Sequence, residues 1–352
     1  MPKYATFSDV LEARIRRGDY VVRELPTEFE LAREFGASRK TARRAVQNLL
    51  DKGIVIRKRS GRLTVNGEHE SMDGRLQLAF LSMSFYSTNA EAWRFAVSRS
   101  AERVGAVVRP IDFVHWQDPV ILETLDGFDG VFLMPNSEKI PDSILERFGE
   151  ARHLVSLDND LSQWNVPSIR LLSPRFIHWL GDHLYGLGHR RIDCLNTQPE
   201  DQVIEQRKEQ WLLWQRVHNT EGRMISEPVA PYDHATPQAY RVMKQLLKTG
   251  EFTATALVCL TNAVATGAIR ALQEEGLRVG QDVSVCAMEG ETQARFQWPS
   301  RTVLEPPEPD LYINLCIDWF AKRTEPWIGP RLLEPSTLQL FQGESTGPCV
   351  GT

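Results

Sequence analysis

The stretch LPTEFELAREFGASRKTARRAVQNLL, residues 25–50, decides the fold of the N-terminal part of the chain. Thr27 and Glu30 have the spacing of a capping box, and the helix that they begin would end at Gly36. Ser38 can cap a second helix that continues to about residue 50. A helix, a short glycine turn and a helix with a basic first half are typical of a helix-turn-helix DNA-binding motif.

The segments on either side extend this motif. Residues 7–17 predict a preceding helix, and the apolar runs at 54–56 and 63–65 predict two antiparallel strands after it. The connection at 57–62 holds four basic residues and a glycine. A basic hairpin beside a recognition helix is typical of a wing, which can lie along phosphates or enter the minor groove. Residues 1–66 therefore predict a winged helix-turn-helix domain.

Charge is distributed unevenly along the chain. The net charge is −5, yet residues 1–67 contain fifteen Lys or Arg and eight Asp or Glu, which leaves −12 for the remainder. Within 37–66 there are nine basic residues and one acidic residue, Asp51. A basic head on an acidic body indicates that the head binds nucleic acid. The predicted DNA contacts are Ser38, Arg39, Lys40, Thr41, Arg43, Arg44, Arg57, Lys58, Arg59 and Arg62.

Residues 3–66 resemble the GntR-type winged-helix head. The matching residues are Leu25-Pro26-Thr27-Glu28, Glu30-Leu31-Ala32, Phe35-Gly36, Ser38-Arg39, Thr41 and Arg43. The resemblance implies that the first turns of the recognition helix contact DNA and that the wing supports them. Phe29 is a departure, because such heads usually carry arginine there, and one expected phosphate or base contact is therefore absent.

From residue 76 onward, short apolar runs alternate with amphipathic helical segments. Strands are predicted at 78–81, 106–108, 130–133, 153–157, 192–195, 256–260 and 283–285, and helices at 90–104, 141–149, 173–187, 205–218 and 263–275. This alternation is typical of a doubly wound parallel α/β sheet, and the segment is long enough for two lobes. The predicted domains are the head at 1–66, a linker at 67–75, a two-lobed sensor at 76–346 and a tail at 347–352.

The body resembles the ligand-sensing domain of LacI/GalR-type repressors, which is similar to periplasmic sugar-binding proteins. The matching phrases are Asp129-Gly130-Val131, Leu157-Asp158, Gly188-His189-Arg190-Arg191-Ile192, Gly267-Ala268, Asp282-Val283-Ser284-Val285 and Gly343-Glu344-Ser345-Thr346. A GntR-type head on such a body resembles the arabinose-repressor type of hybrid regulator. The resemblance implies a homodimer that binds a pseudo-palindromic operator and responds to a small-molecule effector, a sugar or a sugar derivative.

In this fold a ligand binds in the crevice at the carboxyl ends of the strands. The resemblance implies pocket roles for Asp158, Arg207, Asn262 and Glu289. The aromatic candidates for a sugar-facing surface are Phe85, Tyr86, Trp93 and Trp298. The alternative for Asp158 is a capping role, and for each aromatic residue it is a position in the core or between the lobes.

Asn262 stands where the family usually carries an aspartate. Asparagine both donates and accepts hydrogen bonds but carries no charge, whereas aspartate only accepts. Arg207 would then lie beside a missing anion. A carboxylated or otherwise derivatised sugar is therefore one hypothesis for the effector.

Other classes of protein find little support. There is no GxSxG, P-loop, HExxH or GxGxxG motif, and acidic pairs such as Asp158 and Asp160 lack a positioned histidine, so we expect no catalysis, cofactor or metal site. Five scattered cysteines without a CxxC pair predict reduced thiols. Without a leader-like or membrane-length apolar run, we expect a cytoplasmic protein. A repressor is the preferred interpretation, with an activator of the same architecture or a solute receptor as alternatives.

Overall fold

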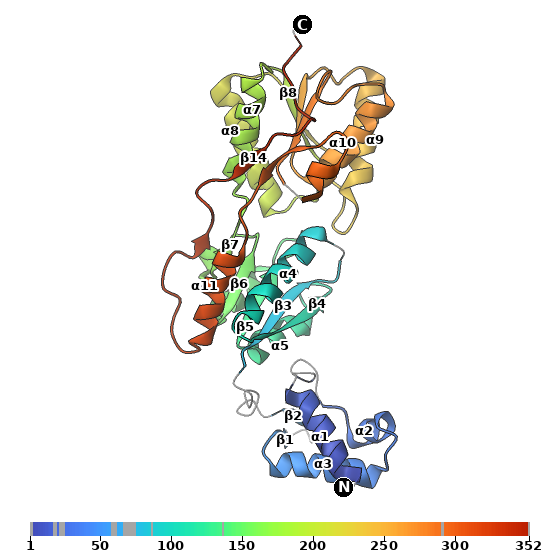
Figure 1. The fold of residues 1–352 in the computed structure, drawn as a ribbon, viewed down its shortest axis with the longest axis vertical. Helices are drawn as coiled ribbons and strands as arrows, with labels where there is room; N and C mark the ends of the chain where they lie inside the picture. The colour runs from blue at the N-terminus through green and yellow to red at the C-terminus, as the bar shows by residue number, and fades with distance from the viewer. Residues whose placement is uncertain are drawn as a thin grey trace.

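The computed structural model describes residues 3–16, 20, 25–57, 62–65, 75–85, 87–135, 137–289 and 292–350. Along the chain, a small helical head is followed by two α/β lobes (Figure 1). Lys58, Arg59 and Tyr86, which the sequence analysis singled out, lie outside the described residues.

The head consists of three helices and a two-stranded hairpin. The helices are α1 (Lys3–Arg16), α2 (Glu28–Glu34) and α3 (Arg39–Asp51), and the antiparallel strands are β1 (Val55–Arg57) and β2 (Leu63–Val65). Thr27 and Glu30 form the predicted capping box, in which the Thr27 amide donates to the Glu30 carboxylate at 2.8 Å. The Ser38 hydroxyl accepts from the Thr41 amide at 3.1 Å and begins α3. Both helix starts therefore follow from local capping.

The first lobe contains a six-stranded parallel sheet in the order β13-β7-β6-β5-β3-β4. The strands are β3 (Gln77–Met83), β4 (Val107–Phe113), β5 (Gly130–Met134), β6 (Leu154–Leu157), β7 (Ser168–Ile169) and β13 (Leu332–Leu333). Its helices are α4 (Thr88–Glu102), α5 (Pro119–Gly127), α6 (Asp142–Glu150) and α11 (Asp310–Ala321), with a short 3-10 helix, η1 (Ser162–Trp164).

The second lobe repeats this arrangement in the order β14-β12-β11-β10-β8-β9, parallel except that β14 runs antiparallel to β12. The strands are β8 (Ile192–Asn196), β9 (Met224–Ser226), β10 (Ala256–Cys259), β11 (Ser284–Ala287), β12 (Thr302–Glu305) and β14 (Gln339–Phe341). Its helices are α7 (Ile177–Gly186), α8 (Gln202–His218), α9 (Ala235–Thr249) and α10 (Asn262–Glu274), with 3-10 helices η2 (Pro174–Phe176) and η3 (Thr292–Phe296).

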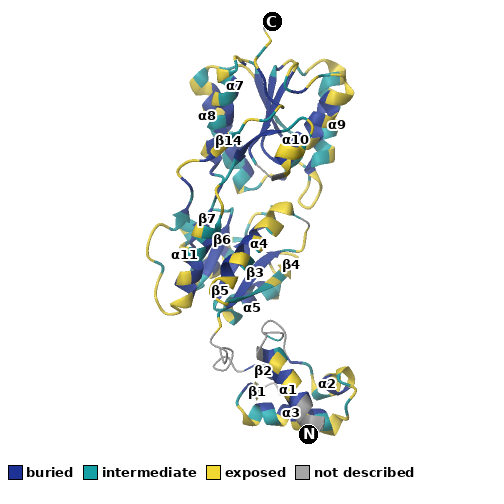
Figure 2. Cartoon of the chain, in the orientation of Figure 1, coloured by how far each residue is buried: buried dark blue, intermediate teal, exposed yellow. Residues whose placement is uncertain are grey.

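Helices cover both faces of each sheet, so that the central strands are buried along nearly their whole length (Figure 2). This explains why the central strands appear in the sequence as continuous apolar runs and not as alternating ones. In both lobes the strand order reverses beside the first strand, between β3 and β5 and between β8 and β10. A crevice at the carboxyl ends of these strands is the usual ligand site of such sheets.

The chain crosses between the lobes three times. It leaves the first lobe after β7, returns between β12 and α11, and crosses again between β13 and β14. The C-terminal part of the sequence thus supplies α11 and β13 to the first lobe, and Figure 1 shows these two elements beside strands drawn in cyan and green. Within the described part of the chain, no helix is long and apolar enough to cross a bilayer.

Candidate DNA-binding surface and ligand cleft

Helix α3 has one apolar face and one basic face. Ala42, Ala45, Val46 and Leu49 are buried in the core of the head, whereas Arg39, Lys40, Arg43 and Arg44 are exposed. Because the buried side chains recur at intervals of three or four residues, the cations gather on the opposite face. The first turn of α3 therefore presents positive charge and free backbone amides together, which is an arrangement suited to phosphate.

The cations on this face differ in their partners. Arg39, Lys40 and Arg43 form no ion pair or hydrogen bond with any other side chain of the described residues. Arg57 lies 3.7 Å from the carboxylate of Glu28, which connects the hairpin to α2. The three residues of α3 thus keep their charge available for a ligand outside the chain.

Ser38 and Thr41 are engaged with each other. Their hydroxyl oxygens lie 2.7 Å apart, and Ser38 also accepts from the Thr41 amide. Phe29, at the start of α2, is 60% exposed. A large apolar side chain thus stands in solvent near the start of the motif, where the resemblance would place an arginine.

The carboxyl ends of the central strands of the two lobes form the candidate ligand cleft. Asp158 directly follows β6 of the first lobe, and Glu289 follows β11 of the second lobe by one residue. The negative charge of Glu289 acts on Asp158 across the space between the lobes and contributes to raising the pKa of Asp158. The sequence-predicted residues Asp158, Arg207 and Glu289 are thus brought together by elements far apart in the chain.

Arg207 is a buried cation, only 4% exposed, that projects from the second turn of α8. Its Nη1 donates to the carboxylate of Glu289 at 2.7 Å and to the carbonyl oxygen of Leu260 at 2.8 Å. Its Nε is buried and has no hydrogen-bond partner among the described residues. Glu289 therefore supplies the anion that the sequence analysis expected to be missing, and the reason for expecting a carboxylated effector disappears.

Asp158 has an unusual backbone and a crowded side chain. Its φ is +62°, a left-handed conformation that few residues other than glycine adopt. Its carboxylate accepts hydrogen bonds from Asn89 and from the indole of Trp93. Burial raises the pKa of Asp158, although these two hydrogen bonds and the charge of Arg207 act in the opposite direction. Asp158 is held by α4 and does not cap the segment that follows it.

Asn262 is the first residue of α10 and is 4% exposed. Arg301 donates to its side-chain oxygen and, at 3.0 Å, to its backbone carbonyl oxygen. The acceptor of this amide is therefore occupied within the second lobe. What Asn262 can still offer a ligand is its NH2 group.

Aromatic residues lie between the lobes at one rim of the cleft. Phe85, just after β3, has its ring 5.7 Å from that of Tyr232 and 5.9 Å from that of His234. Burial and a hydrogen bond to Glu138 raise the pKa of Tyr232 to about 12. The sequence analysis missed Tyr232, His234 and Glu138 because they lie in loops without a recognisable motif.

Two of the aromatic candidates lie elsewhere. Trp93 is 4% exposed and belongs to the core of the first lobe, so it positions Asp158 and offers no open ring face. Trp298 is 83% exposed, and its carbonyl oxygen accepts from Gln273 in the last turn of α10. Since the 13 residues of α10 span roughly 20 Å and the helix begins at the cleft, Trp298 lies on the outer side of the second lobe.

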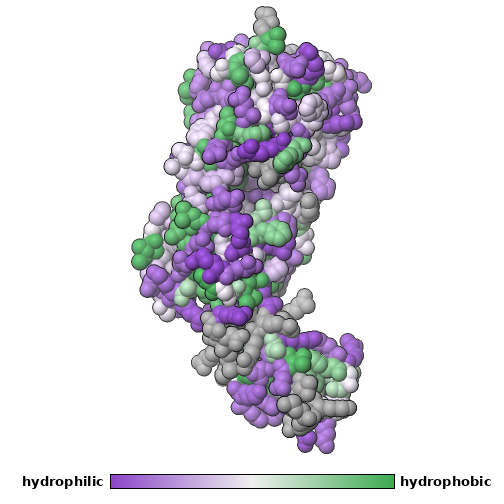
Figure 3. All heavy atoms as spheres, viewed as in Figure 1, coloured by the Kyte–Doolittle hydropathy of each residue, from purple (hydrophilic) through white to green (hydrophobic). Residues whose placement is uncertain are grey.

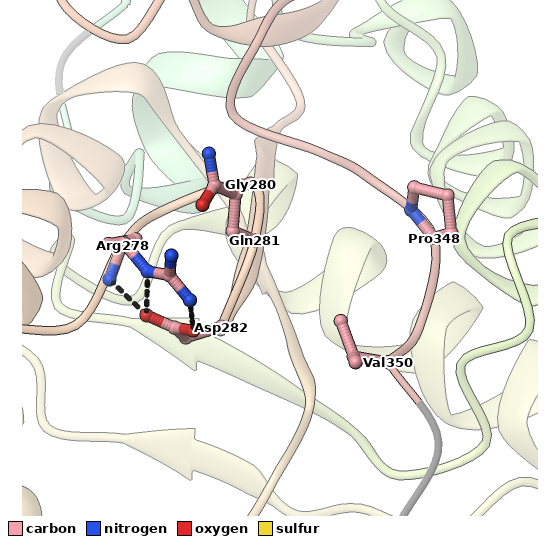
Figure 4. Close-up of a pocket in the computed structure, with 6 residues that line it drawn as sticks. All are labelled: Arg278, Gly280, Gln281, Asp282, Pro348 and Val350. Carbon is pink, nitrogen blue, oxygen red and sulfur yellow. Dashed lines mark hydrogen bonds and ion pairs between the residues drawn. The ribbon is translucent and has the colours of Figure 1, made fainter.

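Another hollow lies at the opposite edge of the second lobe. It has a volume of about 540 Å³ and is lined by Arg278, Gly280, Gln281, Asp282, Pro348 and Val350 (Figure 4). Arg278 and Asp282 are joined by two hydrogen bonds between their side chains, and the Arg278 amide also donates to the Asp282 carboxylate at 2.8 Å, as the dashed lines show. Arg278 and Asp282 precede β11, whereas the cleft lies beyond the end of that strand. Because its charged groups satisfy each other, this hollow is no competitor to the cleft.

Family models identify both parts of the chain. Residues 3–65 match the gntR family of bacterial regulatory proteins, and residues 181–346 match a periplasmic binding protein-like domain. The chain is thus a hybrid of a gntR-type helix-turn-helix head and a periplasmic-binding-protein-like body. The fold class predicted from the sequence is confirmed.

Among proteins of known function, the chain is similar to HTH-type transcriptional repressors named PurR. It is 27% identical over 219 residues to the protein of Escherichia coli O1:K1 / APEC, and this match covers 58% of this chain and 62% of that protein. It is 26% identical over 274 residues to the protein of Klebsiella pneumoniae (strain 342), and this match covers 72% of this chain and 78% of that protein. The chain therefore spans less than two thirds of the length of the first of these relatives.

Solved structures share the fold at lower identity. The lac repressor dimer bound to operator and the anti-inducer ONPF has a TM-score of 0.64 and 19% identity, with 80% of this chain and 97% of that chain covered. A LacI family transcriptional regulator from Enterococcus faecium with bound ribose has a TM-score of 0.63 and 18% identity, with 77% and 99% covered. These likenesses establish the two-lobed architecture.

Proposed function

We propose that this protein is a ligand-responsive transcriptional repressor that acts in the cytoplasm and binds operator DNA through α3 and the β1–β2 hairpin. The observation that carries the proposal is the trio Arg39, Lys40 and Arg43, three exposed cations on one helix face without partners among the described residues. Cations placed in this way can neutralise phosphates or donate to guanine edges. The neighbouring predicted contacts are Ser38, Thr41, Arg44, Arg57 and Arg62.

The test uses the full-length protein and a duplex operator selected by it from a random DNA library. Arg43→Ala and Arg39→Ala should each weaken binding by about 1–3 kcal/mol if the side chain reads a base, or reduce the salt slope by about 1 if it contacts a phosphate. Arg241→Ala, which removes an exposed cation from α9 of the second lobe, is the matched control and should bind like wild type. Wild-type affinity and salt slope in both head variants would refute the assignment of α3.

We further infer that the effector is a neutral or amine-bearing polyhydroxyl compound of the sugar type. Three carboxylates, those of Asp158, Glu289 and Asp201, lie around Arg207, so carboxylate acceptors predominate around this cation. The guanidinium of Arg301 is bonded to Asn262. Carboxylates accept hydrogen bonds from hydroxyl and amino groups. The ribose bound to the Enterococcus faecium regulator is consistent with this ligand class.

A panel of neutral sugars, amino sugars and sugar acids tests the effector class by calorimetry and thermal shift. We expect binding from the neutral or amino compounds and a rise in melting temperature. Asp158→Asn should weaken that binding because an acceptor is replaced by an amide. Tight binding of a sugar acid with no response to neutral sugars would contradict this assignment.

We also propose that the protein acts as a homodimer on a pseudo-palindromic site, as two-fold symmetry requires. Apolar side chains lie in separate patches on an otherwise hydrophilic surface (Figure 3). Phe296 and Trp298 of the second lobe are each 83% exposed. Exposed aromatic side chains of this size are favoured anchors of protein–protein interfaces. A promoter assay distinguishes a repressor from an activator of the same architecture.

A further inference from the structure

A largely buried arginine lies where the chain passes from one lobe to the other. Arg170 directly follows β7, at the first crossing, and its side chain is only 11% exposed. Its backbone amide donates to the carbonyl oxygen of Leu333, which ends β13 at the third crossing. Arg170 is thus built into two of the three crossings at once.

The guanidinium of Arg170 has partners on three different segments. Its Nη2 and Nε donate to the carboxylate of Glu334 at 3.0 and 3.3 Å, which joins the first crossing to the third. Its Nη1 donates to the side-chain oxygen of Gln206 on α8 at 3.2 Å, and the same nitrogen lies 3.9 Å from the carboxylate of Asp160. An arginine fork can hold several acceptors in fixed directions, which a lysine cannot do.

Two of these partners lie next to proposed ligand residues in the sequence. Gln206 is adjacent on α8 to Arg207, and Asp160 lies two residues after Asp158. Arg170 therefore contacts the second lobe next to one proposed ligand residue, and approaches the first lobe next to another. The contact with Gln206 is a hydrogen bond, whereas the approach to Asp160 is longer than one.

We propose that Arg170 is a hinge-positioning residue, which ties the angle between the lobes to the state of the cleft. In the present arrangement it is bonded to α8 and to the third crossing. Rotation of the lobes moves Gln206 and Asp160 relative to each other, so that the guanidinium must exchange one partner for the other. A largely buried cation with two alternative acceptors favours two discrete lobe angles over a continuous range.

Arg175 provides a matched control within the same region. It lies on η2, its side chain is 54% exposed, and its Nη2 is 3.4 Å from the other oxygen of Glu334. It therefore shares the carboxylate partner of Arg170. Among the described residues, however, Arg175 has no polar contact with α8 or with Asp160.

The experiment measures the distance between the lobes in the full-length protein. Spin labels are placed on Glu146→Cys of α6 and Lys248→Cys of α9, both exposed positions, in a Cys349→Ser background, since the other four cysteines are buried. Pulsed electron–electron double resonance then gives the distribution of distances between the two labels for each hinge variant. The measurement is made on the protein without DNA or ligand. Thermal melting of each labelled protein confirms that it is folded.

We expect Arg170→Met to shift the mean distance or broaden its distribution by more than about 2 Å, the scale of hinge rearrangements. Arg170→Lys and Gln206→Leu should show the same change to a smaller extent, and they decide the question if Arg170→Met does not fold. Arg175→Met should give the wild-type distribution. A wild-type distribution for folded Arg170 variants, or an equal change in Arg175→Met, would overturn the proposal.

The proposed hinge role of Arg170 rests on one part of the proposed function, namely that a ligand binds in the cleft. Operator binding by the same unlabelled variants reports on that function separately. A protein that fails to bind DNA but shows the expected distances would contradict the regulator assignment and leave the hinge assignment standing. Wild-type distances with normal operator binding would contradict the hinge assignment and leave the regulator assignment standing.

Discussion

At the scale of single residues, His189 shows how burial changes ionisation. It lies between α7 and β8 and is 3% exposed. Its Nδ1 lies 2.9 Å from the hydroxyl of Thr255, and its Nε2 lies 3.0 Å from that of Ser284 and 3.1 Å from the carbonyl oxygen of Gly347. It thereby fastens the C-terminal segment to the start of β11. Burial lowers the pKa of His189.

This lowered pKa predicts a loss of stability in acid. The unfolded chain, with a histidine pKa near 6.5, then binds protons more readily than the folded one, so stability is complete above about pH 6.5 and falls below it. His189→Gln should cost about 1–3 kcal/mol at neutral pH and should show a smaller further loss on acidification. Urea unfolding between pH 7.5 and 5.5 measures both effects. An unchanged pH dependence in the variant would contradict the role of His189 and point to His183, whose pKa burial also lowers.

At the scale of elements, α7 and α8 approach closely because Gly181 has no side chain. A Cβ at Gly181 would lie 2.4 Å from the ring of Trp214, which is 1% exposed and stacked on Trp211. The indole of Trp214 also donates to Asp182 at 2.7 Å, which fixes its orientation. The ring therefore has little freedom to move away.

Gly181→Ala should destabilise the second lobe by about 1–3 kcal/mol, because a methyl group is forced into a filled space. Gly186→Ala is the matched control on the same helix, since nothing lies within 4 Å of a Cβ at that position. It should be neutral or stabilise by up to about 1 kcal/mol through helix propensity. Urea unfolding followed by tryptophan fluorescence compares the two. Equal effects at both glycines would rule out the close packing as the cause.

At the scale of the whole molecule, the exposed aromatic residues of the second lobe test the proposed homodimer. Phe296→Glu and Trp298→Glu should each weaken association by about 2 kcal/mol, roughly thirty-fold in Kd, if these side chains anchor the interface. Operator affinity should fall in parallel, because two linked heads bind a palindrome more tightly than one. Light scattering over a concentration series measures the association.

Ile328→Glu is the control for this experiment. Ile328 is 84% exposed on the segment between α11 and β13, in the first lobe. The substitution therefore adds the same charge at an equally exposed position. It should leave the dimer intact. Dissociation by Ile328→Glu alone would place the interface on the first lobe instead.

The head and the fold class could be predicted from the sequence because their determinants are local. The caps at Thr27 and Ser38, the apolar face of α3 and the basic residues beside it all follow from spacing within a few turns of helix. The central strands were recognisable as short apolar runs, since helices cover both faces of the sheets. Helices α5, α9 and α11 were not predicted, although all three are present.

The cleft was decided by the tertiary structure, because its contacts join segments that are distant in the chain. Arg207 meets Glu289 only when α8 packs beside β11, and Arg170 meets Glu334 only when β13 returns to the first lobe. Trp298 was a pocket candidate from the sequence, yet its contact with Gln273, at the far end of α10 from the cleft, places it on the outer surface. Capping, periodicity and charge act between near neighbours and can be seen in the sequence. The partner of a buried charge depends on which strand edges meet, and only the folded chain determines that.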